Sequence, residues 1–579
     1  MARGSAPYRE SAFTNGYEFT RGSGYALPQY PFTSPPELTG AATTRYPVAI
    51  VGAGITGLTL ACALAQRGIR AVLLDEDDSV GVKGAASRGI CYTQKSLEIF
   101  QRLGIYERIE AKGIQWSVGR TFAGIDEIYS FDLRQQSSFQ LSGQPPFINI
   151  QQFYIEGFLV ERIQALAAER PGVDIRWRSR VVGFSQQTGF ANLEVDTPAG
   201  RYTLEATHVI DASGSHTPFH RWCQAGMQAR RGDDRWCIAD VRFKHTPPTE
   251  RHTWIEAPFN DNRAVWQHLM ADDVWRIDYQ MPPDTDPAHA SSEAQVRARL
   301  ARQFGPGVDC EIVWVGPYAY RSQCLDRLRI GSVFFMGDTA KVVSPFGARG
   351  GNTGVADADN LAWKLVAVLR GQAPAALLDS YNDERLEAAR QNVQVTNRTT
   401  RFLRPSDGIE RIFRNAVIGL ARRHPFARQL VNTGRMAVAN AYTQSRVCER
   451  TGGLSVQNVG FRWLDGTAGC VNDLLRWADD RFLLLCFGDL APAATQRLVS
   501  LGRHAPVCSV QVLGPDGHTQ AVEAVRDPMG QLQGACHVFG HAWALVRPDA
   551  YLAATGEAID GALVCAVERA LGLRMGDAT

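Results

Sequence analysis

Glycines and a carboxylate with the spacing of a phosphate-binding turn occur early in the chain. Gly52, Gly54 and Gly57 follow a short apolar run, and a second apolar run ends at Asp75. Glycines at this spacing permit a tight turn, let the backbone approach a pyrophosphate and let a helix pack closely on a strand. Because an acid at the end of the next strand can bind ribose hydroxyls, the stretch predicts a dinucleotide site at a helix N-terminus.

A second glycine-rich stretch, FFMGDTAKVVSPFGARGGNTG, lies at residues 334–354. An apolar strand-like run ends at Gly337 and Asp338, and a helix is predicted to begin near Asn352. Asp338 can accept hydrogen bonds from a polyol, while the glycines let the positive end of the helix approach the edge of a flat ring. The stretch therefore predicts the other half of a cofactor site, with a loop that only caps a helix as the alternative.

The residues around the first turn have the periodicity of an α/β fold. Residues 47–77, PVAIVGAGITGLTLACALAQRGIRAVLLDED, read as a buried strand, a glycine turn, a helix and a second buried strand. Residues 153–170 have a helical period, and residues 173–195 read as strands that lead into the apolar segment THVIDASG. The glycine turn therefore lies in a βαβ unit with a parallel sheet.

Strand-forming residues dominate the middle of the chain, from about residue 225 to residue 328. In VWRIDYQM, apolar and polar residues alternate strictly, which predicts an antiparallel sheet with one covered face. The apolar face carries Trp275, Ile277, Tyr279 and Met281, and the polar face carries Arg276, Asp278 and Gln280.

These differences in composition and periodicity divide the chain into segments. Residues 1–45 are rich in Gly, Pro, Ser and Tyr, so they are either an extended arm tethered by its tyrosines or a disordered tail. Near the C-terminus, RFLLLCFG reads as a central strand and HAWALVRPDAYLAA as a hairpin. The expected segments are an N-terminal arm at 1–45, a dinucleotide-binding domain at 46–224 and 329–452, a substrate-binding sheet domain at 225–328 and an α/β domain at 453–579.

The composition and charge of the chain exclude several classes of protein. The chain of 579 residues has a formal net charge of +2, which gives no electrostatic footprint for nucleic acid. It contains no apolar run long enough for a membrane span and no secretory signal. Its twelve cysteines include no Cys-x-x-Cys pair, so we expect reduced thiols and no zinc ribbon or other metal site. We therefore expect a cytoplasmic enzyme that acts on small molecules.

Together, the two glycine-rich stretches resemble the FAD-dependent aromatic hydroxylases, the class A flavoprotein monooxygenases of the para-hydroxybenzoate hydroxylase and phenol hydroxylase family. The similarity covers about residues 47–400, and GDTAKVVSPFGARGGNTGVADADNLAWKL resembles the specific family signature. Further matches are ASRGICYTQKSLEIFQRLG, QQFYIEGFL and LLDSYNDER. The resemblance implies a Rossmann-like FAD-binding domain, an inserted antiparallel-sheet substrate domain and a C-terminal thioredoxin-like α/β domain.

The resemblance also implies roles for individual residues. Asp338 would hold the flavin ribitol, and Pro345 would lie against the isoalloxazine near its oxygen-reacting carbon. Arg88 would face the phosphates of FAD, and Gln152 would contact the cofactor. The expected cofactor-binding set is Gly52, Gly54, Gly57, Asp75, Arg88, Gln152, Gly337, Asp338, Pro345, Gly350, Gly351 and Asn352.

The chain departs from the family pattern at two positions. Lys341 stands where the family has a histidine, which changes a local hydrogen bond and adds a charge near the cofactor entrance. In DASGSHTPFHRW, other residues replace most of a motif that contacts both FAD and NAD(P)H, and Asp211 and Arg221 are neighbours that could compensate. The choice between NADH and NADPH therefore stays open. The residues of this chain at the positions of that motif are Ser213, Gly214, Thr217 and His220.

The implied reaction is hydroxylation of a phenolic aromatic substrate with NAD(P)H and O2 through a flavin C4a-hydroperoxide, in a pocket that excludes water. Catalytic candidates are Pro345, His268 and Tyr320, and a structural role is the alternative for His268. Aromatic side chains of the sheet domain either line the pocket or form sheet core. They are Trp254, Trp266, Trp275 and Tyr279.

Other functions remain open at this stage. The same chemistry could epoxidise a polyketide-like ring system or insert oxygen into it by a Baeyer-Villiger reaction. A flavoprotein dehydrogenase and a non-catalytic flavin-binding subunit or sensor are further alternatives. The C-terminal domain resembles that of the phenol hydroxylase branch, but its isolated cysteines argue against dithiol exchange and favour a structural or dimer-supporting role. These cysteines are Cys470, Cys486, Cys508, Cys536 and Cys565.

Overall fold

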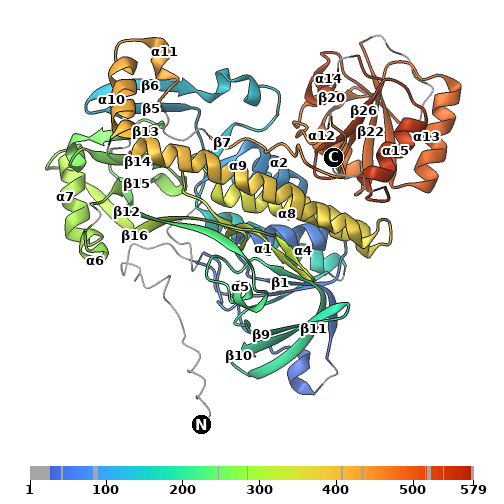
Figure 1. Cartoon of the computed structure of the whole chain (residues 1–579), viewed down its shortest axis with the longest axis horizontal. Helices are drawn as coiled ribbons and strands as arrows, with labels where there is room; N and C mark the ends of the chain where they lie inside the picture. The colour runs from blue at the N-terminus through green and yellow to red at the C-terminus, as the bar shows by residue number, and fades with distance from the viewer. Residues whose placement is uncertain are drawn as a thin grey trace.

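The fold is known from a computed structural model. It describes residues 27–40, 43–81, 89–170, 172–245, 247–282, 284–405, 408–431, 436–450, 452–515, 517, 519, 523–538 and 540–574. Figure 1 shows the C-terminal α/β unit, coloured orange to red, at one side of the molecule and the helices α10 (Ile409–Ala421) and α11 (Pro425–Arg428) at the opposite side.

The first sheet contains the predicted βαβ unit and is mostly parallel. Its central strands are mostly apolar and buried, as β2 with its four buried residues illustrates. The strand order is β17-β18-β11-β1-β2-β8, and the β9–β10 hairpin extends β11. The strands are β1 (Arg45–Val51), β2 (Ala71–Leu74), β8 (Val173–Arg176), β9 (Arg180–Gln187), β10 (Phe190–Thr197), β11 (Gly200–Asp211), β17 (Arg329–Ile330) and β18 (Val333–Phe335).

Three helices from distant parts of the sequence pack beside this sheet. They are α1 (Ile55–Gln66), α4 (Gln152–Glu169) and α8 (Gly350–Leu369). Helix α1 contacts both of the others, and its side chains are buried along most of its length. The helix that follows the first glycine turn therefore lies in the centre of the molecule, directly beside the helix that follows the second turn.

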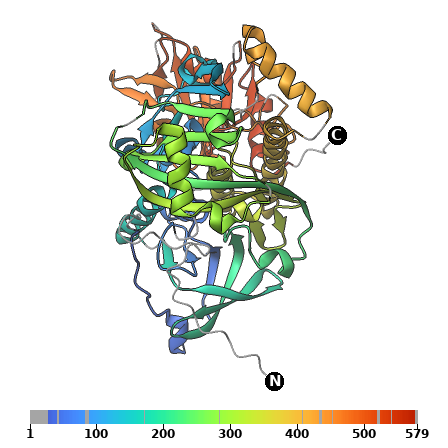
Figure 2. The same cartoon turned by 90° about the vertical axis from the view of Figure 1, so that its left-hand side faces the viewer.

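The second sheet is the predicted inserted sheet, and it recruits strands from outside residues 225–328. Its order is β19-β16-β12-β15-β14-β13-β5-β6, so strands from the first third of the chain complete one edge. Figure 2 shows this sheet, in green, above the strands of the first sheet. The strands are β5 (Val118–Ala123), β6 (Asp126–Asp132), β12 (Met227–Phe243), β13 (Arg251–Ala257), β14 (Arg263–Leu269), β15 (Val274–Gln280), β16 (Cys310–Leu325) and β19 (Lys341–Val342).

Both faces of the inserted sheet are covered, which corrects the expectation of one covered face. Trp275, Ile277 and Tyr279 pack with Val296 and Leu300 of α7 (Glu293–Phe304), as the alternation predicts. The opposite face is also largely buried, because it forms one wall of an internal cavity. Strict alternation identifies two chemically different faces, but it does not say that the polar face is exposed to solvent.

A small third sheet connects the two larger ones. It contains β3 (Cys91–Thr93), β4 (Ile114–Gln115) and β7 (Phe147–Asn149) in the order β3-β7-β4. Helices α2 (Gln94–Leu103) and α3 (Tyr106–Lys112) follow β3, and Thr93 caps α2 by accepting a hydrogen bond from the Ser96 amide. The short helices α5 (Phe219–Trp222) and α6 (Pro287–Ala290) complete the first two thirds of the chain.

The C-terminal unit is a separate α/β layer around a seven-stranded sheet. Strand β22 is the predicted central strand, and β25 and β26 form the predicted late hairpin. All twelve cysteines of the chain are free. The elements are β20 (Gly460–Trp463), β21 (Ala468–Cys470), α12 (Val471–Ala478), β22 (Phe482–Phe487), α13 (Pro492–His504), β23 (Val507–Leu513), β24 (Ala524–Arg526), α14 (Gln531–Ala535), β25 (Trp543–Val546), β26 (Leu552–Gly556) and α15 (Gly561–Ala570).

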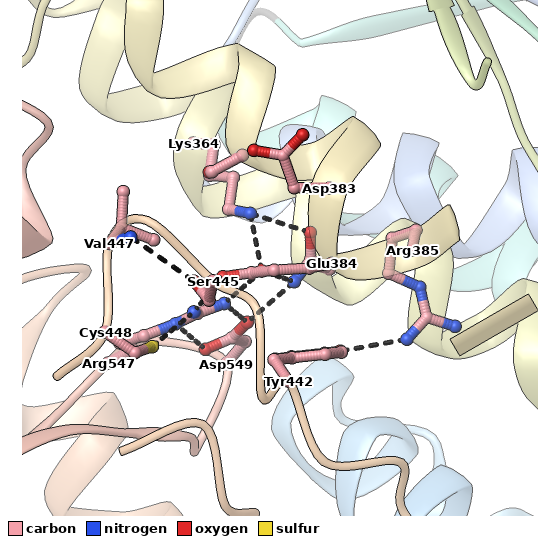
Figure 3. Close-up of polar contacts among 12 residues, drawn as sticks. Lys364, Asp383, Glu384, Arg385, Tyr442, Ser445, Val447, Cys448, Arg547 and Asp549 are labelled. Atoms are coloured by element: carbon pink, nitrogen blue, oxygen red, sulfur yellow. Dashed lines mark hydrogen bonds and ion pairs between the residues drawn. The ribbon is translucent and has the colours of Figure 1, made fainter. Parts of the chain in front are cut away.

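A buried ionic cluster joins the C-terminal unit to α8 and to α9 (Asp379–Leu403), as Figure 3 shows. Glu384 of α9 accepts hydrogen bonds from Lys364 at 2.7 Å and from Arg547 at 2.6 Å. Arg547 also pairs with Asp549 at 2.6 Å. All four side chains are almost completely buried, so the C-terminal unit is fixed to the rest of the chain by charges that have no access to water.

The described part of the N-terminal segment, residues 27–40, lies against the first sheet. Tyr30 stacks on Trp177 with ring centroids 4.4 Å apart, and Glu37 forms a buried ion pair with Arg176 at 3.0 Å. A tyrosine thus tethers this part of the segment. Among the described residues, no helix combines the length and the apolar character that a membrane crossing requires.

Candidate active site

One cavity of about 710 Å³ connects both glycine-rich turns with the inserted sheet. Gly54 of the first turn and Pro345 of the second turn line the same space, as the sequence predicts for one shared cofactor. Arg88 lies outside the described residues, and Gly57 does not line the cavity. The expected cofactor-binding residues that do line it are Gly52, Gly54, Asp75, Gln152, Gly337, Asp338, Pro345, Gly350, Gly351 and Asn352.

The first turn needs glycine for two different reasons. Gly52 has a φ of +106°, and a Cβ there would lie 2.5 Å from the carbonyl oxygen of Ala212. A Cβ at Gly57 would lie 1.9 Å from the carbonyl oxygen of Gly52, so only glycine lets α1 approach the turn this closely. The Asp75 carboxylate accepts hydrogen bonds from the Ala53 amide at 2.5 Å and the Asp77 amide at 2.9 Å, which hold β2 against the turn.

A second carboxylate, Glu156, lies beside the first turn, and sequence reasoning missed it. Glu156 accepts hydrogen bonds from the Gln152 side chain at 2.7 Å and the Gly81 amide at 2.9 Å. Burial raises the pKa of Glu156 to about 7, although these hydrogen bonds oppose the shift. The available signal was an acid one helical turn after Gln152, on a face that is otherwise apolar.

The second turn packs directly on the helix of the first. A Cβ at Gly337 or at Gly354 would lie 2.6 Å or 2.2 Å from the Thr56 hydroxyl oxygen, so both glycines permit contact with α1. The Asn352 side chain donates to the Cys91 carbonyl at 2.8 Å and accepts from the Thr93 amide at 2.9 Å. Asn352 therefore also joins the start of α8 to β3.

Lys341, the first departure from the family pattern, does not line the cavity. Its ammonium group lies 2.7 Å from the Asp357 carboxylate, and both side chains are buried. Asp357 also accepts hydrogen bonds from Arg385 at 2.6 Å and from the Gly337 amide at 3.0 Å. Burial opposes ionisation of Asp357, but the charges of Lys341 and Arg385 hold its pKa below the usual value. The added charge is thus neutralised beneath the second turn and is not at the cofactor entrance.

The second departure, in the loop after β11, is organised by Asp211. This buried carboxylate accepts hydrogen bonds from the hydroxyls of Ser213 at 2.6 Å and Thr217 at 2.7 Å. Burial raises the pKa of Asp211 to about 6. A ring nitrogen of His220 lies 2.7 Å from the Thr339 carbonyl oxygen, which joins the loop to the second turn. Asp211 therefore holds the loop in place from beneath, while Ser213, Gly214 and Thr217 line the cavity.

The polar face of the inserted sheet forms the remaining wall of the cavity. Pairing between β12, β13, β14 and β15 aligns its side chains in two rows across the sheet. The first row contains Arg251, His268, Arg276 and Asp240, and the second contains Thr253, Trp266, Asp278 and Ile238. The residues of these rows that line the cavity are Arg251, His268, Arg276, Trp266, Asp278 and Ile238.

Charges dominate the first row. Arg276 forms a buried ion pair with Asp240 at 2.9 Å. His268 lies between Arg276 and Arg251, and burial together with these two cations lowers the pKa of His268 well below its usual value. The imidazole is therefore neutral at physiological pH, and its Nδ1 has no hydrogen-bond partner among the described residues. His268 reaches the cavity as expected, but it is a poor proton acceptor there.

The four aromatic candidates of the sheet lie on two different faces. Trp266 lines the cavity and packs against Trp236 and Phe346 at centroid distances of 4.4 Å and 5.1 Å. The others, Trp254, Trp275 and Tyr279, belong to the apolar layer that contains α7 and do not line the cavity. The side chain of Tyr320 lies outside the described residues.

The groups around the cavity fit a flavin dinucleotide. A Cβ at Gly350 or Gly351 would meet no atom within 4 Å, so a flat ring can approach the backbone there. Helices α1 and α8 both begin at the cavity, and no side chain of their N-cap residues caps either first turn. Two positive helix ends thus face one space, which suits an anionic pyrophosphate at one end and an electron-rich ring edge at the other.

Comparison with known proteins agrees with this geometry. A family model described as an FAD binding domain matches residues 45–396. A flavin-dependent monooxygenase of Mycobacteroides abscessus is 30% identical over 349 residues, which cover 59% of this chain and 71% of the relative. The 6-methylpretetramide 4-monooxygenase of Streptomyces rimosus is 27% identical over 570 residues, with 90% and 92% of the two chains covered.

A phenolic acid hydroxylase and a solved structure complete the comparison. The 3-(3-hydroxy-phenyl)propionate/3-hydroxycinnamic acid hydroxylase of Mycolicibacterium gilvum is 25% identical over 527 residues, 88% of this chain and 89% of the relative. The structure of the flavin-dependent monooxygenase PieE with FAD and substrate has a TM-score of 0.78 at 21% identity and covers 92% of this chain and 100% of that chain. The chain therefore belongs to the family of FAD-dependent aromatic hydroxylases, and it is a flavoprotein monooxygenase that binds FAD.

Proposed function

We propose that this monooxygenase uses NAD(P)H and O2 to hydroxylate a phenolic aromatic substrate. The observation that carries the proposal is the single cavity in which both FAD-binding turns face the polar side of the inserted sheet. Trp266 offers an aromatic surface on that side, and charged groups adjoin it. An aromatic ring with an ionisable hydroxyl is complementary to both features.

Different residues of the cavity would bind different parts of FAD and of the substrate. The backbone at Gly52 and Gly54 would bind the pyrophosphate of FAD, while Asp338 would bind its ribitol and Gly350 and Gly351 would approach the ring. When bound, FAD supplies electron transfer from NAD(P)H and activation of O2. The walls of the cavity would orient the aromatic ring and exclude water from the reaction.

A second candidate is oxygenation of a larger polyketide-like ring system by epoxidation or Baeyer-Villiger insertion. The relatives include 6-methylpretetramide 4-monooxygenase, and the fold matches that of aklavinone-11 hydroxylase with a TM-score of 0.73 at 20% identity. These names describe the other proteins, and they support a multi-ring substrate as a candidate for this chain. A product with a new aromatic hydroxyl favours the first proposal, whereas an epoxide or lactone favours the second.

We also propose a thioredoxin-like fold and a structural or dimer-supporting role for the C-terminal unit. Its central β22–β23 parallel pair, flanked by the antiparallel β25–β26 hairpin, supports the fold assignment. Burial raises the pKa of the Cys486 and Cys536 thiols to about 12, so neither thiol is poised for exchange. A cytoplasmic location stays a prediction from the sequence.

Aerobic turnover tests the proposed function. The FAD-loaded protein is mixed with NADH or NADPH and a panel of simple phenols and hydroxylated multi-ring compounds, while NAD(P)H, O2 and products are measured together. We expect a product one oxygen heavier, with a new aromatic hydroxyl, formed in step with O2 and NAD(P)H consumption. A flavoprotein dehydrogenase would form product without consuming O2 in step with it. Absence of NAD(P)H oxidation with every compound would favour a non-catalytic flavin-binding protein.

A further inference from the structure

The cavity wall contains a buried cation that no carboxylate of the described chain neutralises through a hydrogen bond. Arg251, the first residue of β13, is only 8% exposed and lines the cavity. Its Nη1 donates to the Met436 sulfur at 2.9 Å, and its Nε has no partner among the described residues. A guanidinium in this environment is strongly under-solvated, because a thioether sulfur is a weak acceptor. An anionic oxygen in the cavity would satisfy it.

A carboxylate on the same wall also makes no hydrogen bond with another described residue. Asp278 of β15 lines the cavity, and none of the hydrogen bonds between described residues involves its oxygens. The neighbouring Arg276 is already paired with Asp240, so it is not a dedicated partner of Asp278. Burial raises the pKa of Asp278 to about 6, with Arg276 and Arg251 opposing the shift and Asp240 adding to it. Asp278 can therefore take up a proton when an anion binds beside it.

The other groups that face Asp278 are less suited to accept a proton. His268 on β14 is kept neutral by burial and by the two arginines. Burial raises the pKa of the Cys91 thiol on β3 to about 12. Tyr318 on β16 lines the same cavity and is a phenol itself. On the sheet wall, Asp278 is thus the carboxylate that lines the cavity and makes no hydrogen bond with another described residue.

The register of the sheet allows both groups to reach one substrate atom. Strand β14 separates β13 from β15, and Arg251 and Asp278 lie in neighbouring rows, so their backbones are about 10 Å apart across the sheet and about 7 Å apart along the strands. The side chains project from the same face, and the arginine is long enough to span most of this distance. Trp266 lies between these strands on the same face, where it can contact the aromatic ring.

We propose that Arg251 and Asp278 bind the ionisable hydroxyl of the aromatic substrate from two sides, with Asp278 accepting its proton and Arg251 holding the phenolate oxygen. The O–H bond breaks, its proton forms a new bond to a carboxylate oxygen of Asp278, and the electron pair stays on the substrate oxygen. The inference rests on the proposed function, because a phenolate is the form of the ring that is rich in electrons at the ortho and para carbons.

The experiment uses the oxidised FAD-loaded enzyme and needs no turnover. The probe is 4-nitrophenol, with 4-nitroanisole as a matched ligand that cannot ionise. Difference spectra show whether the bound ligand is the phenolate. Calorimetry at pH 8 in buffers of different ionisation enthalpy gives the number of protons taken up. Because the free probe is largely ionised at that pH, we expect binding of the phenolate with uptake of about one proton by Asp278.

Variants separate the two roles. Arg251→Met is expected to weaken binding of 4-nitrophenolate tenfold or more, a loss of about 1.4 kcal/mol or more, and to abolish its preference over 4-nitroanisole, while Arg251→Lys keeps part of the preference. Asp278→Asn is expected to bind the phenolate at least as tightly as the wild type, without proton uptake. Arg297→Met and Asp273→Asn, at exposed positions outside the cavity, serve as matched controls.

Three results would overturn the inference. The first is an unchanged preference for 4-nitrophenolate in Arg251→Met. The second is proton uptake by Asp278→Asn equal to that of the wild type. Loss of bound FAD in Arg251→Met with the ligand preference intact would assign Arg251 to the cofactor and would also overturn it. Failure of the turnover assay with all phenols would contradict the proposed reaction, but it would not alter these binding results.

Discussion

The Lys341 ammonium donates to the Asp357 carboxylate at 2.7 Å in the interior of the protein, directly beneath the second glycine turn. Since Asp357 also binds the Gly337 amide, this ion pair supports the part of the chain that is expected to hold the flavin. The residue that departs from the family pattern is therefore a structural part of the cofactor site.

Replacing Lys341 with methionine should destabilise the protein. Asp357 would keep Arg385 but lose one of its two cations in a site without water, and removal of one partner of a buried pair typically costs about 3–5 kcal/mol. Urea unfolding of the apo protein and FAD titration measure the effect, and we expect weaker FAD binding as well. Lys244→Met, which removes an exposed pair with Asp309, should change stability by less than about 1 kcal/mol. Equal stabilities of the two variants would contradict this account.

Asp338→Ala should yield folded protein that is largely free of FAD. The carboxylate lines the cavity at the second turn, where it is expected to bind the ribitol of the cofactor. Absorbance of the purified protein near the flavin bands, together with far-UV circular dichroism, distinguishes loss of cofactor from loss of fold. Asp359→Ala is the matched control, because Asp359 pairs with Arg102 and does not line the cavity. Full FAD occupancy in Asp338→Ala would refute the role assigned to this carboxylate.

Arg547→Met should loosen the C-terminal unit from the rest of the chain. The substitution leaves Asp549 without its cation, while Lys364 still neutralises Glu384. We expect a loss of about 3–5 kcal/mol and, in calorimetry, a separate transition for the C-terminal unit at lower temperature. A double-mutant cycle with Glu384→Gln should give a coupling energy above about 1 kcal/mol. A single unchanged transition in Arg547→Met would show that this cluster does not fix the unit.

The two tryptophans on opposite faces of the inserted sheet should respond differently to replacement by leucine. Trp266→Leu alters the cavity wall and should weaken binding of phenols. Trp275→Leu disrupts packing against α7, so it should lower stability by up to about 3–5 kcal/mol and leave phenol affinity in the folded fraction nearly unchanged. Binding titrations and thermal melts of both variants measure the contrast. Equal effects on phenol affinity would mean that the polar face is not the substrate wall.

Glu156 should give the apo protein a characteristic dependence of stability on pH. Its pKa of about 7 in the folded state lies above the value of about 4.3 for an unfolded chain. Its contribution is therefore fully present below about pH 4 and is lost as the pH rises to about 7, by about 4 kcal/mol in total. Glu156→Gln should reduce the fall in unfolding free energy between pH 5 and pH 8. Glu161→Gln, at an exposed position of the same helix, should leave the profile unchanged.

Local signals specify the two glycine-rich turns, and the predicted elements around them are confirmed, since each turn follows a strand and precedes a helix. Glycine spacing, the apolar runs before each turn and the helix after each turn are all readable within about 30 residues. The shared cavity at Gly54 and Pro345 confirms that the two turns meet. Strand β22 and the β25–β26 hairpin were likewise predicted from local patterns.

The substrate half could not be predicted in the same way. Alternation in VWRIDYQM separates two faces, but the tertiary partner of each face decides its role, and α7 covers the aromatic one. Asp278 is therefore only one polar position of an alternating strand in the sequence, and no pattern singles out Arg251. The Glu156–Gly81 contact and the Lys341–Asp357 pair form only in the tertiary structure, so residue spacing alone does not identify the partner of either Glu156 or Lys341.

A crystal structure of the FAD-loaded protein with a bound phenol tests the central claim most directly. The account predicts one FAD molecule that reaches from Gly54 to Pro345, with the phenol ring beside Trp266 and its oxygen between Arg251 and Asp278. Density for FAD away from either glycine turn, or for the phenol on the α7 side of the sheet, would contradict the account.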